Sequence, residues 1–243
     1  MNDDKKKAAV AGWLFIAGTV CGIMSAILSG SILGSRDYLA QAAAHQTQLT
    51  LSALLVLSMG FTLALIPVVL YPVLKKHDEV FALGYVVFRG CLETVTYLVI
   101  TISFLLLAVL VQGSSAASIT DPAALRTTGF ILKKAAETGT VATAIVFPLG
   151  ALMLYTVLFR SKLVPRWLSL WGIIGVLLHL SISGLAVAFT MDKPLPEILT
   201  ILNLPIAVQE MYMAVYLIAK GFDSSAPLHV ADAVPVAVGG RNT

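Results

Sequence analysis

The chain has 243 residues, of which 58% are hydrophobic and only 12% charged, and its formal net charge at pH 7 is +3. A soluble domain carries about 25% charged residues, so this chain has too little polar surface to coat a soluble globule. The composition indicates an integral membrane protein. The modest positive charge favours contact with an anionic membrane surface, and we expect no nucleic-acid partner.

Six apolar segments are long enough to cross a bilayer, which requires about 20 residues of α-helix. They are expected at roughly 8–33, 49–74, 80–111, 139–159, 167–190 and 197–219. The first follows a charged MNDDKKK stretch, as in a signal peptide, but its apolar run is longer than the roughly 7–15 residues of a signal-peptide core. We therefore expect it to remain as an uncleaved first span.

These elements predict an all-α, polytopic membrane protein, built as a six-transmembrane-helix bundle. We expect a cytoplasmic N-terminus at 1–7, one six-helix transmembrane domain at 8–222, and a disordered cytoplasmic tail at 223–243. The tail is expected to be disordered because it follows a glycine helix stop and consists of small residues and prolines.

The distribution of basic residues predicts the orientation of the bundle. With the N-terminus inside, nine Lys and Arg residues lie near the cytoplasmic ends of the spans and five near the opposite ends. The nine are Lys5, Lys6, Lys7, Lys75, Lys76, Arg160, Lys162, Arg166 and Lys220, and the five are Arg36, Arg126, Lys133, Lys134 and Lys193. Both termini are therefore expected in the cytoplasm, and the short basic loops at 75–79 and 160–166 predict tight antiparallel hairpins.

The two longer loops, at 34–48 and 113–139, lie on the opposite side and contain helical stretches. Asp121 followed by Pro122 has the pattern of a helix N-cap with proline in the first turn. Two interpretations stay open for the segment that follows. It either rests on the membrane surface, with apolar side chains down and Arg126, Lys133 and Lys134 toward water, or extends the fourth span outward.

Ionisable residues on three of the predicted spans fall at similar depth. Counted from the cytoplasmic ends at 1.5 Å per residue, Arg89 and Glu210 lie about 14 Å deep, His179 about 18 Å and Glu93 about 20 Å. Charges near the bilayer centre cost about 2.5–3.5 kcal/mol each on insertion scales, so such residues face the bundle interior and pair. We expect one guanidinium, that of Arg89, to bridge the Glu93 and Glu210 carboxylates.

This polar set has a functional and a structural interpretation. It is either a ligand-binding or proton-handling site, formed by Arg89, Glu93 and Glu210 with His179 adjacent, or a polar lock that keeps the third and sixth spans in register. His179 alone is typical of a hydrogen-bonded core histidine. A metal site from His179, Glu93 and Glu210 is allowed by ligand type, but we expect neither a metal nor a cofactor.

Three stretches of the chain, taken together, resemble a known family. FRGCLET (88–94), YTVLFRSKLVPRWLSLWGIIG (155–175) and VQEMYMAVYLIAKGF (208–222) are similar to the uncharacterised bacterial membrane family called domain of unknown function 4386. The features shared with that family are Arg89 with Glu93, Pro165 with Arg166, and Glu210 with Lys220-Gly221. The sequence departs from the family pattern at Ser169, where glycine is common, and at Gln209, where a small residue is expected. The resemblance covers roughly residues 8–222 and implies this fold and the bacterial inner membrane, without an established activity.

Three functional hypotheses follow, in descending order. The first is a binding or transport-related protein whose arginine accepts a small polar or anionic ligand while the carboxylates set its proton dependence. The second is a structural or regulatory membrane protein whose cluster is only a polar lock. The third is an intramembrane enzyme with Glu93 or Glu210 as general base, for which the chain shows no metalloprotease, phosphate-binding-loop or serine-hydrolase motif.

Overall fold

The computed structural model describes residues 3–115, 121–189 and 195–223, and within these ranges all regular structure is helical. The predicted tail at 223–243 therefore lies, except for Asp223, outside the described residues. The helices are α1 (Asp3–Leu33), α2 (Tyr38–Ala44), α3 (Gln46–Leu74), α4 (Glu79–Tyr85), the π-helix η1 (Val86–Leu92), α5 (Glu93–Ser115), α6 (Pro122–Ser161), α7 (Arg166–Phe189) and α8 (Leu195–Ala219).

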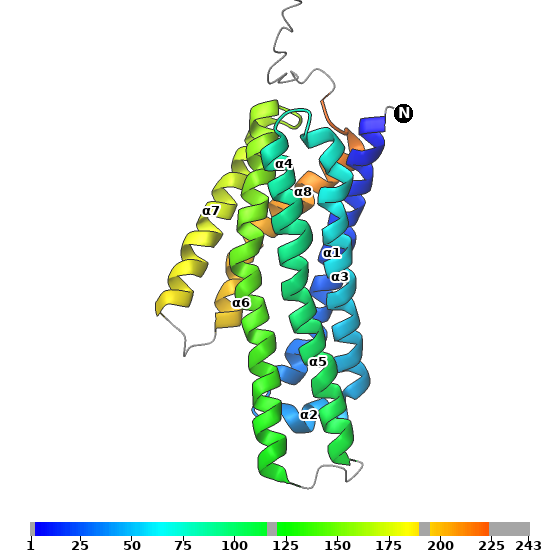
Figure 1. The fold of residues 1–243 in the computed structure, drawn as a ribbon, viewed down its shortest axis with the longest axis vertical. Helices are drawn as coiled ribbons and strands as arrows, with labels where there is room; N and C mark the ends of the chain where they lie inside the picture. The colour runs from blue at the N-terminus through cyan, green and yellow to red at the C-terminus, as the bar shows by residue number, and fades with distance from the viewer. Residues whose placement is uncertain (1–2, 116–120, 190–194, 224–243) are drawn as a thin grey trace, which may run out of the picture.

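Four helical segments are long and apolar enough to cross a membrane, judged on the described residues. They are Asp3–Leu33, Gln46–Leu74, Glu79–Gly113 and Pro122–Ser161, and the third of them joins α4, η1 and most of α5 into one continuous rod. Two shorter apolar stretches, Arg166–Ser181 and Leu204–Ala219, belong to α7 and α8. The long helices run alongside one another, with α7 and α8 against one end of the bundle (Figure 1). An all-helical, multi-pass membrane architecture follows from these lengths.

The two short basic loops form the tight hairpins expected of them, at the end of the bundle where the N-terminus lies (Figure 1). After α3, the Asp78 side chain caps α4 by accepting a hydrogen bond from the Phe81 backbone N–H at 3.1 Å. After α6, Lys162 adopts a left-handed conformation, with φ of 60°, and so ends the helix.

The segment after Asp121 belongs to one uninterrupted helix of 40 residues, α6. The Asp121 side chain accepts a hydrogen bond from the Ala123 backbone N–H at 2.9 Å, which confirms the predicted N-cap. The outward extension of the fourth span is therefore correct, and the surface-helix alternative is wrong. The helix runs without a break from Pro122 to Ser161, and even Pro148 is accommodated within it.

The N-terminal half of α6 packs against other parts of the chain. The Lys133 Nζ atom donates to the Leu33 carbonyl at the end of α1, at 2.7 Å, and lies 4.8 Å from the centroid of the Tyr38 ring. The expectation that Lys133 faces water is therefore wrong, because the last carbonyls of α1 need a donor and the lysine supplies one. Beside it, Gly129 leaves room for Leu39 of α2, since a Cβ there would lie 2.6 Å from that side chain.

The helices approach each other closely where α1 passes α3 and α8. A Cβ on Gly18 would lie 2.7 Å from Leu63 of α3, and one on Gly12 would lie 2.6 Å from the Ala214 carbonyl of α8. These glycines act in packing within the bundle, as small residues do in membrane helices. Ser25 of α1 and Ser52 of α3, both buried, add an interhelical hydrogen bond of 2.8 Å.

Large apolar side chains cover the outside of the long helices. Ile27, Phe61 and Val95, for example, are 56–67% exposed. In a soluble domain such a surface would be an aggregation hazard, whereas in a bilayer it is the face presented to lipid. Trp13 and Trp167 are half or more exposed near the end that carries the basic hairpins, where interfacial aromatic anchors are expected.

Candidate functional site

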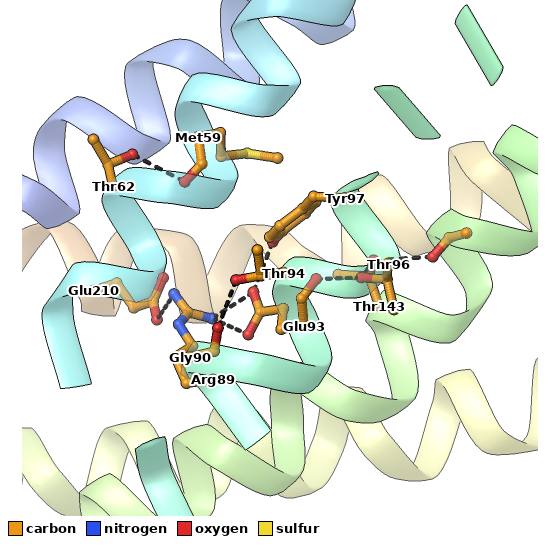
Figure 2. Close-up of polar contacts among 11 residues, drawn as sticks. Met59, Thr62, Arg89, Gly90, Glu93, Thr94, Thr96, Tyr97, Thr143 and Glu210 are labelled. Carbon is orange, nitrogen blue, oxygen red and sulfur yellow. Dashed lines mark hydrogen bonds and ion pairs between the residues drawn. The ribbon is translucent and has the colours of Figure 1, made fainter. Parts of the chain in front are cut away.

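Arg89 of η1 lies between two carboxylates that come from different helices (Figure 2). Its NH1 atom donates to both oxygens of Glu93 at 3.1 Å, and its NH2 atom donates to Oε1 of Glu210 at 3.3 Å. The predicted bridging of two acids by one arginine is thus confirmed. With both carboxylates ionised, one guanidinium faces two negative charges, and the cluster carries a net charge of −1.

Arg89 belongs to a π-helix, which the sequence analysis did not anticipate. Tyr85, Arg89, Glu93 and Tyr97 are spaced by four residues. In an α-helix of 3.6 residues per turn, each such step drifts about 40° around the axis, so the four would spread over about a third of the circumference. The wider π-helical turns reduce this drift, and π-helical insertions are frequently found at functional sites. The π-helix therefore keeps these polar side chains on the buried face.

Glu93 is fully engaged in the cluster. Its side chain is 0% exposed. Besides the two hydrogen bonds from Arg89, its Oε1 atom accepts one from the Tyr97 hydroxyl at 2.7 Å. Tyr97 itself is buried one turn further along α5. The hydroxyl and the guanidinium together replace water around this carboxylate, as burial of a charge requires.

Glu210 of α8 accepts fewer hydrogen bonds than Glu93 does. Its Oε1 atom accepts the hydrogen bond from Arg89, while its Oε2 atom makes none among the described residues. The Glu210 side chain is 13% exposed, compared with 3% for Arg89 and 0% for Glu93. This carboxylate is therefore the most accessible charged group of the cluster.

One aromatic ring of a further helix borders the arginine. The guanidinium carbon of Arg89 lies 4.7 Å from the centroid of the Phe147 ring of α6, which is cation–π distance. The buried His179 of α7 contacts the same ring edge-on, with 5.8 Å between centroids. His179 is thus adjacent to the cluster through Phe147. The sequence analysis missed Phe147 because a phenylalanine in an apolar span gives no signal of its own.

A second polar group lies one residue from Glu210 on α8. The buried Gln209 side chain accepts a hydrogen bond from the Tyr155 hydroxyl of α6 at 2.6 Å and donates to the Leu168 carbonyl of α7 at 3.1 Å. One glutamine therefore ties three helices together. This explains how a large polar residue is accommodated at a position where a small one was expected.

The Tyr85 hydroxyl is buried without a hydrogen bond. The residue is 1% exposed, and its Oη atom has no hydrogen-bond partner within the part of the chain that the structure describes. Tyr85 precedes Arg89 by four residues, about one helical turn, on the same rod. A buried polar group of this kind requires an explanation, because leaving it unbonded costs about 1–3 kcal/mol.

The metal-site alternative gains no support from the geometry. Over residues 3–113, 121–181 and 204–223, whose side chains are described, no group of three or more His, Cys, Asp and Glu residues is placed to hold a metal ion. His179 lies against Phe147, and both carboxylates are directed to Arg89. The chemistry available at this site is ionic and hydrogen-bonding.

Comparison with known proteins identifies the class of this chain. The family model described as "Domain of unknown function (DUF4386)" matches residues 10–221, which include every residue of the cluster. The chain therefore belongs to that family, as the three resembling stretches implied. Comparisons with curated proteins and with solved structures return no significant match.

Proposed function

We propose that this protein spans the bacterial inner membrane six times, with both termini in the cytoplasm, and binds or translocates a small molecule. The binding site is the cluster of Arg89, Glu93 and Glu210, with His179 adjacent. Its surroundings are the lipid bilayer and the other helices of the bundle.

The number of spans rests on helix length. α7 has 24 residues and α8 has 25, which at 1.5 Å per residue exceeds the roughly 30 Å of hydrocarbon in a bilayer. Their described parts are apolar, and a short hairpin joins α7 to α6. The excess of nine over five basic residues supports cytoplasmic termini, and the family resemblance supports the inner membrane.

The observation that carries the binding function is the incomplete bonding of Glu210. A purely structural ion cluster would be expected to satisfy all its members, since a partly satisfied buried network is less stable than an apolar core. Glu93 accepts three hydrogen bonds, whereas one oxygen of Glu210 accepts none from the described residues and the Glu210 side chain is 13% exposed. Intramembrane ionisable residues with an accessible side mark ligand or ion sites.

A polar lock is the second candidate, and a specific observation favours it. Arg89 and Glu93 are almost completely buried, and both terminal nitrogens of the guanidinium are occupied. Such a cluster would hold the η1–α5 rod against α8 without any ligand.

Thermal unfolding in detergent separates the two candidates. The melting temperature of the wild-type protein would be measured from pH 5 to 9 against small anions, amines and lipids, in parallel with Glu210→Gln. Glu137→Gln is the matched control, because this partly exposed carboxylate pairs with Lys134 on the outer part of α6. A ligand-dependent rise that only Glu210→Gln abolishes supports binding. If no compound shifts the wild type and Glu210→Gln changes only the baseline, the cluster is a polar lock.

A further inference from the structure

We infer that the ligand of this site is a small protonated amine, held between the Glu210 carboxylate and the Tyr85 hydroxyl. This inference rests on the proposed function and specifies the charge of its ligand. The sequence alone pointed instead to a polar or anionic group at Arg89. We infer a cation instead because most hydrogen-bond donors of the cluster already bind protein carboxylates, whereas some of its acceptors receive no hydrogen bond from the described residues.

The donors of Arg89 are directed to protein carboxylates. Three hydrogen bonds from its two terminal nitrogens go to Glu93 and Glu210. The aromatic ring of Phe147 lies 4.7 Å from its guanidinium carbon. An anionic ligand would compete with two carboxylates for the arginine and would add a third negative charge beside them. Like charges at this spacing repel strongly in a low dielectric.

The acceptors of the cluster are in excess. Oε2 of Glu210 receives no hydrogen bond among the described residues, and the Tyr85 hydroxyl, whose oxygen has lone pairs, also has no partner there. Two carboxylates against one guanidinium leave one negative charge to be balanced. A single positive charge with hydrogen-bond donors satisfies all three conditions.

An ammonium group fits these acceptors better than a metal ion does. It has three N–H donors that can be shared between one carboxylate oxygen and one hydroxyl, and it requires no fixed coordination number. A divalent cation would require several oxygen ligands, and the described residues place no group of three metal-ligating side chains together.

The test measures the melting temperature of the full-length protein in detergent with ethylammonium chloride, sodium formate and sodium chloride at equal ionic strength. The wild type is compared with Tyr85→Phe, which removes only the unbonded hydroxyl, and with Glu210→Gln. Tyr212→Phe is the matched control, because Tyr212 lies half-exposed on α8 against Trp167, away from the cluster. Because Tyr85→Phe deletes no protein hydrogen bond, its folding is preserved even if Glu210→Gln proves unstable.

We expect saturating ethylammonium to raise the melting temperature of the wild type by about 5 °C, with no effect of formate beyond that of sodium chloride. Tyr85→Phe should weaken the apparent affinity at least about tenfold, Glu210→Gln should abolish the shift, and Tyr212→Phe should keep it. An ethylammonium shift unchanged by Tyr85→Phe and Glu210→Gln overturns the inference. A shift by formate instead overturns the charge assignment while leaving a ligand site. The absence of any shift, together with no response to the wider panel, overturns the proposed function as well.

Discussion

Arg89 and Glu210 are 121 positions apart in the chain, yet the NH2 atom of the arginine donates to Oε1 of the glutamate at 3.3 Å. This contact connects the third long helical rod, through η1, with the last helix of the bundle, α8 (Figure 2). The stability of the cluster can therefore be divided experimentally between a local partner, Glu93, and a distant one, Glu210.

Replacing Arg89 by leucine should destabilise the protein strongly. It leaves two buried carboxylates without their shared donor, and breaking a buried ion pair costs about 3–5 kcal/mol. The double change Arg89→Leu with Glu93→Leu should recover part of the loss, and the further change Glu210→Leu should recover more. Melting temperatures in one detergent give the comparison. A double variant no more stable than Arg89→Leu contradicts the local pairing and leaves Glu210 as the dominant partner.

Two tyrosines one turn either side of the Arg89–Glu93 pair should respond differently to loss of their hydroxyls. Tyr97→Phe removes the 2.7 Å hydrogen bond to Glu93 and should cost about 1.5–3 kcal/mol, since the acceptor is charged. Tyr85→Phe removes a hydroxyl with no hydrogen bond among the described residues, so it should be neutral or stabilising without added ligand. Denaturation of the two variants side by side tests this. Equal losses would mean that the Tyr85 hydroxyl has a protein partner after all.

Replacing Gln209 by leucine should loosen the contact between three helices. The change strands the Tyr155 hydroxyl and the Leu168 carbonyl, and each buried unsatisfied group costs about 1–3 kcal/mol. The matched control is Gln209→Leu combined with Tyr155→Phe, which removes the stranded hydroxyl and should recover part of the loss. The melting temperatures of the single and double variants are compared. A double variant that melts at or below the temperature of Gln209→Leu argues against this hydrogen-bond network.

A methyl group should be tolerated at one glycine and rejected at another. A Cβ at Gly172 of α7 would lie 2.6 Å from the Tyr155 ring, so Gly172→Ala should cost about 1–3 kcal/mol by overpacking. Gly30 of α1 has no atom within 4 Å of the corresponding position, and Gly30→Ala should stabilise the helix by about 0.5–1 kcal/mol. Thermal unfolding of both variants provides the measurement. A neutral Gly172→Ala would mean that α7 shifts easily relative to α6.

The proposed orientation predicts which loops react from outside an intact cell. Ala44 lies exposed at the end of α2, on the side with five basic residues, and Lys75 lies exposed in the short hairpin after α3. In a background without Cys21 and Cys91, Ala44→Cys should react with a membrane-impermeant maleimide in intact cells. Lys75→Cys should react only after lysis. The reverse labelling pattern would mean that the bundle has the opposite orientation in the membrane.

The core of the cluster is predictable from sequence because burying charge in lipid is costly. Arg89, Glu93 and Glu210 stand out in apolar spans, and helix rise places them at similar depth. Phe147 gives no comparable signal, since an aromatic residue is ordinary in such a segment. The residue pattern of the sequence does not indicate the π-helix either, because its hydrogen bonding depends on tertiary packing rather than on residue type.

The long helices are predictable because their apolar runs stand out in the sequence. The course of the N-terminal segment of α6 is not predictable in this way. Asp121 and Pro122 mark where a helix begins, and this start is compatible with either a surface helix or an extended span. What decides between them is the packing of Gly129 on Leu39 and of Lys133 on Leu33. These contacts join segments about 100 residues apart and leave no mark on local composition.

The length of α6 has a mechanical consequence. Its 40 residues measure about 60 Å, twice the hydrocarbon thickness of a bilayer, so a membrane-spanning α6 extends well beyond the lipid. Lys133, in its N-terminal half, holds the contact with α1. Phe147 lies 14 residues further along the same rod, about 21 Å away, with no proline between them. A tilt of the N-terminal half of α6 would therefore also move the Phe147 ring that borders Arg89.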